Sequence, residues 1–319
     1  MHEGSVHHIA IGVRSLKTMK AFYQNILQFN KVFFEFEESE HEIMHEVLRT
    51  SHVVFSGIMF SQEEEGILVE LIKMTNPVPR AVRKDFKYGD IGVSKITIPV
   101  SDLDFIYGEL ESKIDFYSKP KLANVPGWGD YYFVYLRDPE GNLIELISMK
   151  RRRSQNRFGG VRSVGVSVTD LKRSMSFYRK NFGLDRVVID CHESFSGLVD
   201  EVSGGNRTQV RSCVLANSKG SGTIELIEVM KPRGRSIPFA TNFGDFGYLQ
   251  VCLYCNDIEE VAAYCEKEGI EFLSKPQLMD DGIPEHKGSF LYAKDPDGIP
   301  IEFLVLHHPG TIDPSRDRI

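Results

Sequence analysis

The sequence has little of what marks secreted, membrane or nucleic-acid-binding proteins. Its 319 residues include only five cysteines and one tryptophan, too few thiols for a disulfide framework in a chain of this length. No apolar run approaches the roughly 18 residues of a membrane span, and the N-terminus lacks the basic segment and long apolar core of a signal peptide. With a net charge of −7, the chain offers no global basic surface to nucleic acid. We therefore expect a cytoplasmic protein with no membrane or nucleic-acid partner.

The composition is that of a folded globular protein, with 41% hydrophobic and 26% charged residues, and the chain repeats itself once. Three short motifs recur at offsets of 155, 155 and 157 residues: Phe22-Tyr23 with Phe177-Tyr178, Gly89-Asp90 with Gly244-Asp245, and Asp138-Pro139 with Asp295-Pro296. The sequence predicts a first domain over 5–150, a linker over 151–160, a second domain over 161–308 and a C-terminal tail over 309–319. The linker is basic and glycine-ended, which is typical of a solvated connection.

Each half also repeats internally. Short strands rich in valine and isoleucine open four units, a helical stretch follows each, and each unit ends in an apolar strand that carries one acid. Glycine and proline turns precede the last strand of the second and fourth units. We predict an α+β fold of four βαβββ units that form two domains with cupped mixed sheets.

Alternation along the opening strands separates two faces. In the first strand Ile9 and Ile11 share one face, whereas His8 and Ala10 share the other. We expect the branched face to pack on the helices and the polar or small face to line a concave surface. Carboxylates in apolar strands are costly unless they are paired or bound to a metal, which makes the terminal acids candidate site residues: Glu70, Glu145, Glu225 and Glu302.

These motifs together resemble the vicinal oxygen chelate superfamily, which includes glyoxalase I, extradiol dioxygenases and metal-free antibiotic-binding (bleomycin resistance) proteins. The resemblance covers residues ~5–307. It implies that the first residue of each opening strand and the acid of each last strand can bind a divalent metal. The corresponding pairs are His8 and Glu70, Lys95 and Glu145, Ser163 and Glu225, and Gln250 and Glu302.

The implied metal site depends on which units share a cup. Pairing within each half leaves a lysine in one set and a serine in the other, both poor ligands. Pairing unit 1 with unit 4 collects His8, Glu70, Gln250 and Glu302 in one cup, a set similar to that of glyoxalase I. Mixed nitrogen and oxygen ligands suit Zn²⁺, Ni²⁺, Co²⁺, Mn²⁺ or Fe²⁺. The other cup then holds Lys95, whose charge can neutralise a carboxylate in place of a metal.

The resemblance favours a metal-dependent glyoxalase-type isomerase, epimerase or lyase that acts on a small oxygen-chelating substrate through an enolate-like intermediate. Glu70 and Glu302 are the predicted catalytic residues. A ring-cleaving dioxygenase is the alternative, because 284–302 nearly matches the extradiol signature, although Gln250 stands where a second histidine is expected. A metal-free small-molecule-binding protein is a third possibility. Because the chain is duplicated, a monomer is as acceptable as a homodimer.

Several further side chains receive assignments from local pattern. Predicted contributors to the site or its pocket are Tyr292, His286, Trp128 and Tyr131. His7 should face away from His8 and be partly exposed, since neighbours on a strand alternate. The same rule separates Cys252 from Cys255, which favours core packing over a shared zinc or redox role. His41 lies in an acidic segment that we expect to be solvated.

Overall fold

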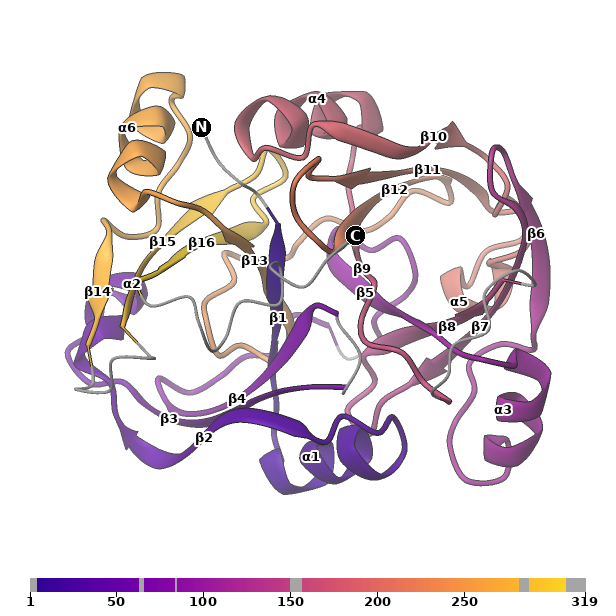
Figure 1. Cartoon of the computed structure of the whole chain (residues 1–319), viewed down its shortest axis with the longest axis horizontal. Helices are drawn as coiled ribbons and strands as arrows, with labels where there is room; N and C mark the ends of the chain where they lie inside the picture. The colour runs from indigo at the N-terminus through magenta and orange to yellow at the C-terminus, as the bar shows by residue number, and fades with distance from the viewer. Residues whose placement is uncertain (1–4, 63–65, 84, 150–156, 281–286, 308–319) are drawn as a thin grey trace.

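The computed structural model describes residues 5–62, 66–83, 85–149, 157–280 and 287–307 (Figure 1). Their elements follow the predicted order of four βαβββ units. Unit 1 contains β1 (Val6–Gly12), α1 (Leu16–Asn25), β2 (Lys31–Glu40), η1 (Glu42–Met44), α2 (His45–Leu48), β3 (Val54–Ser61) and β4 (Leu68–Asn76). Unit 2 contains β5 (Gly92–Pro99), α3 (Leu103–Leu110), β6 (Lys121–Val125), β7 (Gly129–Arg137) and β8 (Leu143–Ser148).

The second half repeats this order. Unit 3 contains β9 (Ser163–Ser167), α4 (Leu171–Asn181), β10 (Arg186–His192), α5 (Asp200–Ser203), β11 (Gln209–Ala216) and β12 (Thr223–Lys231). Unit 4 contains β13 (Gly247–Tyr254), α6 (Ile258–Glu268), β14 (Gln277–Met279), β15 (Gly288–Lys294) and β16 (Pro300–Leu306). No helix in the described part of the chain is long and apolar enough to cross a membrane.

The long helices begin at capped positions. Ser15, Asp102, Asp170 and Asp257 are the N-cap residues of α1, α3, α4 and α6, and each side chain accepts a hydrogen bond from a backbone N–H of the first turn. Such caps satisfy donors that the helix itself leaves unpaired. The recurring acid or serine before each helix therefore explains why the four units start their helices at equivalent places.

In the described part of the chain, two eight-stranded sheets each take strands from both halves. The first has the order β14-β15-β16-β13-β1-β4-β3-β2 and joins units 1 and 4, and the second has the order β10-β11-β12-β9-β5-β8-β7-β6 and joins units 2 and 3. The joining pairs, β1 with β13 and β5 with β9, are antiparallel. The cross-domain pairing is therefore the one the protein uses. Figure 1 shows units 1 and 4 on the left and units 2 and 3 on the right.

The repeated Gly-Asp motif ties the halves together. Asp90 accepts hydrogen bonds from the backbone and guanidinium nitrogens of Arg235, and Asp245 accepts the equivalent bonds from Arg80. Both aspartates are buried, and charge-assisted hydrogen bonds of this kind are strong. Because each half supplies the arginine for the aspartate of the other, the pair of contacts is reciprocal.

The main core lies between the sheets and their helices. Ile9, Ile11 and Val13 belong to it with Met19 and Tyr23 of α1, which confirms that the branched face packs on the helices. Two smaller apolar clusters fill the concave faces, one in each sheet. The domain limits stay predictions, and residues 150–156 and 308–319 lie outside the described part of the chain.

One part of the predicted solvated linker is packed. Phe158 is 1% exposed and bridges to Val100, and the Arg157 guanidinium pairs with Glu109 at 2.5 Å. A solvated connection over all of 151–160 is therefore wrong for its last residues, because the aromatic ring adds to the core.

Candidate functional site

Four predicted ligands meet on the concave face of the first sheet, which we call the first cup. His8, Glu70, Gln250 and Glu302 come from β1, β4, β13 and β16, which are neighbours in the sheet order. His8 Nε2 lies 3.0 Å from Glu302 Oε2 and 3.6 Å from Glu70 Oε2. The amide Nε2 of Gln250 donates to Glu302 Oε2 at 3.3 Å. The side chains of both acids are at most 13% exposed, so the cluster is nearly withdrawn from solvent.

Strand irregularities aim two of these side chains. In the β1–β13 pair, Val6 lies opposite Leu253 and His8 opposite Cys252, so His7 is an extra residue on β1. Leu249 is likewise extra on β13, between the partners of Ala10 and Ile11. A bulge of this kind bends the strand and redirects a side chain. Each bulge stands one residue before a predicted ligand.

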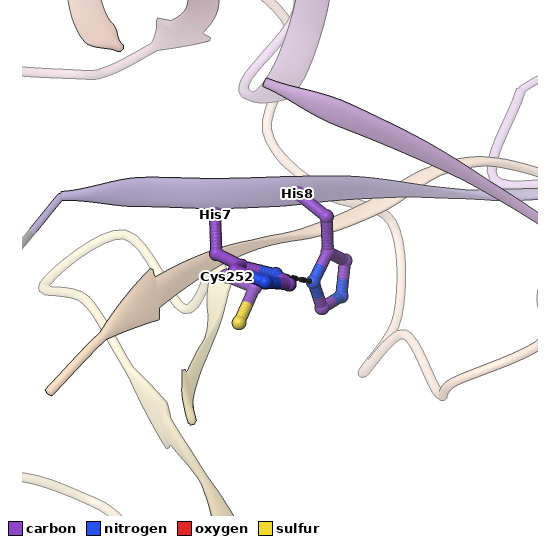
Figure 2. Close-up of side chains that lie close together, drawn as sticks. All are labelled: His7, His8 and Cys252. Carbon is purple, nitrogen blue, oxygen red and sulfur yellow. Dashed lines mark hydrogen bonds between the residues drawn. The ribbon is translucent and has the colours of Figure 1, made fainter. Parts of the chain in front are cut away.

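The bulge also corrects the prediction for His7. Its side chain is buried, with 3% exposure, and its Nδ1 lies 2.9 Å from Nδ1 of His8. Figure 2 shows the two imidazoles on the same side of β1, with Cys252 on the neighbouring strand. Simple alternation fails here because the inserted residue breaks the two-residue period.

Burial and mutual repulsion set the protonation of the first cup. Burial raises the pKa of Glu70 to about 7, the positive charge of His8 opposes that rise, and the charge of Glu302 adds to it. Burial is the largest single influence on the pKa of His8 and lowers it, but the two carboxylates outweigh it and hold that pKa above its usual value. A cation close to the carboxylate oxygens would therefore stabilise the ionised forms of Glu70 and Glu302.

The donor set fits a divalent metal. His8 Nε2 is buried and, although close to Glu302, makes no hydrogen bond to any residue in the described part of the chain. One imidazole nitrogen, two carboxylates and an amide oxygen are ligands that Zn²⁺ and other divalent transition metals accept. The contact with His7 occupies Nδ1 of His8 and leaves Nε2 facing the acids. Metal-binding histidines are commonly oriented in this way by a hydrogen bond to the ring nitrogen that does not bind the metal.

A second group of potential ligands shares His8 but fits less well. Donor atoms of His7, His8 and Cys252 all lie within 4.8 Å of one another. The two histidine nitrogens nearest each other are already 2.9 Å apart and bonded. Burial raises the pKa of the Cys252 thiol well above its usual value, which disfavours the thiolate that a metal requires. The carboxylate side of His8 is therefore the better metal position.

The concave face of the second sheet, the second cup, has a lysine at the equivalent place. Lys95 Nζ lies 2.5 Å from Glu145 Oε2 and 2.8 Å from Glu225 Oε2, and all three side chains are at most 6% exposed. Burial lowers the pKa of Lys95, but the two glutamates outweigh burial and raise it. The expected ion pair is thus present, and an ammonium group bridges the two acids of this cup. Ser163 does not join it, because its hydroxyl donates to the carbonyl of Thr223.

Gly165 makes room for that lysine. A Cβ atom at Gly165 would lie 2.5 Å from Cγ of Lys95, closer than packed carbon atoms allow. The corresponding residue of the first half, 155 positions earlier, is Ala10. The second cup is therefore shaped for the lysine side chain as well as charged for it.

The predicted pocket residues divide between the two cups. Tyr292 is in the first cup, where Gln250 Nε2 donates to its hydroxyl at 3.5 Å. Tyr131 is in the second, and its hydroxyl donates to Glu145 at 3.3 Å. Trp128 packs against the apolar cluster of the second cup and donates to the Val188 carbonyl. His286 lies outside the described residues.

An aromatic wall that sequence reasoning missed lines the first cup. His41 stacks on Phe55 with ring centroids 3.7 Å apart, Phe55 contacts Phe243 at 5.6 Å, and Phe243 contacts Tyr292 at 6.3 Å. His41 is half-buried and bonds through Nε2 to the Phe55 carbonyl. The expectation that this histidine is solvated is wrong, because stacking on an aromatic ring shelters the imidazole. The pairing of aromatic residues from units 1 and 4 leaves no signal in either unit alone.

The cysteines behave as the alternation rule predicts. Cys252 belongs to the apolar cluster of the first cup, whereas Cys255 belongs to the main core on the other face of the sheet. Both are free thiols. Core packing of the two residues is confirmed, and they share no site.

The fold and the convergent acids define a class of protein: paired βαβββ units in which strands from two units bring carboxylates together in one cup. The family model for the glyoxalase/bleomycin resistance protein/dioxygenase superfamily matches residues 5–146 and 160–303. The chain therefore belongs to this superfamily, which includes enzymes that act on small molecules.

Solved structures agree on the fold. Glyoxalase I from Zea mays is 17% identical, with a TM-score of 0.59 over 94% of this chain and 92% of that chain. A putative dioxygenase from Bacillus subtilis is 12% identical, with a TM-score of 0.55 over 95% of this chain and 86% of that one. No curated protein matches the sequence. These comparisons therefore establish the family and the fold but no particular reaction.

Proposed function

We propose that this protein is a divalent-metal-dependent, glyoxalase-type enzyme of the isomerase, epimerase or lyase kind. Its substrate is a small molecule with two adjacent oxygens, and the reaction passes through an enolate-like intermediate. The observation that carries the proposal is the meeting of Glu70, Gln250 and Glu302 around the buried Nε2 of His8, which lies within 3.6 Å of both carboxylates. A bound divalent ion would supply Lewis acidity to the substrate oxygens.

The two glutamates are the proposed proton carriers. They approach His8 from β4 and β16, which lie on either side of the central strands β13 and β1, so each can reach a different side of a bound substrate. A general base works best when its pKa lies near the working pH, and burial brings the pKa of Glu70 to about 7. Glu302 accepts from Gln250, which restrains its orientation. Glu70 is the better proposed base, and Glu302 is the better proposed acid or fixed ligand.

The aromatic wall supports the same chemistry. Phe55 and Phe243 place apolar area beside Tyr292 and the ligand cluster. An apolar lining excludes water and strengthens electrostatic interactions at the carboxylates. It also favours a substrate with an apolar portion next to its oxygen pair. We propose Tyr292 as a residue that positions Gln250 and Glu302.

A ring-cleaving dioxygenase is the second candidate. Two residues of the segment that nearly matches the extradiol signature, Tyr292 and Glu302, lie opposite each other across the β15–β16 pair. Such enzymes use two histidines and one carboxylate on Fe²⁺, whereas β13 supplies Gln250 at the second position. One imidazole in the donor set therefore favours the isomerase type.

Isotope exchange tests the proposal. Protein reconstituted in turn with Zn²⁺, Ni²⁺, Co²⁺, Mn²⁺ or Fe²⁺ should exchange the hydrogen α to the carbonyl of small α-hydroxycarbonyl compounds or acyl thioesters in D₂O. Glu70→Gln should abolish exchange even at a metal concentration high enough to saturate the weakened site. Glu225→Gln, the matched change in the second cup, should leave exchange intact. Ring cleavage of catechols with Fe²⁺ and no exchange would favour the dioxygenase, and neither activity would favour a metal-free binding protein.

We propose a cytoplasmic protein that works as a monomer or homodimer without nucleic-acid or membrane partners. Each cup joins one unit from each half of the chain, because β1 pairs with β13 and β5 pairs with β9. One chain therefore supplies both halves of each cup, and a second copy is not needed to complete the site.

A further inference from the structure

A cavity of about 310 Å³ lies between the two halves of the chain, apart from both cups. Its lining includes residues at the starts of β5 and β13 and at the turn between β7 and β8. None of its described lining residues belongs to the apolar cluster of either cup. The cavity therefore provides a binding volume independent of the candidate metal site.

The cavity has two walls related by the internal duplication. Val82 and Ile91 on one wall correspond, 155 residues later, to Ile237 and Phe246 on the other. Charge, however, is concentrated on one side. Among the described residues, the arginines of the lining are Arg14, Arg83 and Arg137, all from the first half of the chain.

These arginines differ from the ones that hold the fold. Arg80 and its counterpart Arg235 occur in both halves and bind the paired aspartates. Arg83 corresponds to Pro238, and Arg137 corresponds to Lys294 at the offset of 157 residues. The second half of the chain therefore adopts the same fold without an arginine at either of these positions.

Two guanidinium groups in the cavity wall are fixed but incompletely bonded. Arg83 Nη2 donates to the carbonyls of Arg235 and Ser236, and Arg137 Nη2 donates to the Phe86 carbonyl at 3.2 Å. Nε of each arginine is buried and has no hydrogen-bond partner among the described residues. Asp90 is 3.6 Å from Nε of Arg83, beyond hydrogen-bond distance. A buried unpaired N–H costs free energy, so the fold holds both arginines in this wall at a cost.

Glu140, the acidic residue of the described lining, bonds to Arg14 and Ser15 and not to the two buried Nε atoms. Glu140 accepts hydrogen bonds from the backbone nitrogens of Arg14 and Ser15 and from the Arg14 guanidinium. Arg14 also stacks on the Phe246 ring, 4.1 Å from its centroid. The negative charge of Glu140 is therefore used at the rim, whereas Arg83 forms an ion pair with Asp90 at 3.6 Å and the Arg137 guanidinium lies 3.8 Å from the centroid of the Tyr117 ring.

We propose that this cavity binds a small organic oxyanion, a carboxylate or phosphate on an apolar body, between Arg83 and Arg137. Planar guanidinium groups match the geometry of both oxyanions. The remaining lining from Ile91, Ile237 and Phe246 accepts the apolar body. The volume is at the lower end of the range for ligand pockets, about 300–1,000 Å³, which limits the ligand to roughly one ring or a short chain.

Calorimetric titration of the full chain with phenyl phosphate, benzoate and neutral benzamide tests the proposal. The protein is stripped of metal with EDTA and carries His8→Ala, so that no anion can bind through a metal in the first cup. One equivalent of phenyl phosphate or benzoate should bind, and benzamide should not. The stronger of the two anions, with inorganic phosphate alone as a third probe, identifies the oxyanion. Equal binding of benzamide and benzoate, or no saturable binding of either anion, overturns the proposal.

Substitutions locate the binding. Arg83→Gln and Arg137→Gln should each weaken anion binding at least about tenfold, because each removes a charge-assisted pair of bonds. Arg179→Gln, an exposed arginine on α4, makes the same change in net charge and should leave binding unaltered. Unchanged affinity in the two cavity variants contradicts the proposal. If one variant fails to fold, the other variant and the benzoate–benzamide comparison still decide it.

Discussion

Removing the charge of Lys95 should destabilise the protein strongly. Its Nζ lies 2.5 Å from Glu145 and 2.8 Å from Glu225, and the lysine side chain is 1% exposed. At these distances each attraction is on the order of 6 kcal/mol at an effective dielectric constant of 20. Much of that is offset by the cost of burying the charges, so we expect Lys95→Met to cost about 3–5 kcal/mol, the usual loss when one partner of a buried pair is removed.

Thermal and urea unfolding measure this loss. For domains of this size, 3–5 kcal/mol corresponds to a fall in Tm of roughly 6–20 °C. Lys20→Met is the matched control, because Lys20 pairs with Glu35 at a site where both side chains are over a quarter exposed, and such pairs contribute at most about 1 kcal/mol. Adding Glu145→Gln and Glu225→Gln to Lys95→Met should restore most of the stability. A loss below about 1 kcal/mol for Lys95→Met would refute the reasoning that an ammonium holds the second cup together.

Three further outcomes are expected. In a competition titration with a chromophoric chelator, metal affinity should fall about tenfold from pH 8 to pH 6. Burial raises the pKa of Glu70 to about 7, and the protonated carboxyl group must lose its proton before it binds metal. Affinity independent of pH would be inconsistent with Glu70 as a ligand. His7→Phe should weaken metal binding about 10–100-fold in the same titration, since it removes the group bonded to the ligand imidazole, and unchanged affinity would remove His7 from that role. Gly165→Ala should lower the free energy of urea unfolding by about 1–3 kcal/mol, because the new Cβ meets the Lys95 side chain. Gly108 in α3 has open space around its Cβ position, so Gly108→Ala should stabilise the protein. Equal effects of the two substitutions would contradict the packing account.

Much of the fold could be predicted because its signals are local. The caps Asp102, Asp170 and Asp257, the glycine turns and the two-residue alternation of the strands act within a few residues of each other. The duplication then multiplies each signal. The unit pairing was accessible for a different reason: sorting side chains by ligand chemistry placed His8 and Gln250 in one cup and Lys95 in the other, and the strand order agrees.

The rest of the site depends on contacts between units. The burial of His7 follows from a bulge that exists only in the register of β1 with β13. His41 stacks on Phe55 of β3, and Phe55 contacts Phe243, which precedes β13. These contacts join side chains that lie far apart in the sequence. No periodicity within one strand encodes such contacts. The arginine-lined cavity likewise appears only when both halves are folded together.

Metal content tests the central claim most directly. Protein purified without a histidine tag and analysed by mass spectrometry should carry about one equivalent of a divalent metal per chain. His8→Ala and Glu302→Ala should each lose it while the circular dichroism spectrum and cooperative unfolding are retained, and Glu225→Gln should keep it. Absence of metal from the unaltered protein after reconstitution, or metal retained in both cup variants, would contradict a metal centre built from His8, Glu70, Gln250 and Glu302.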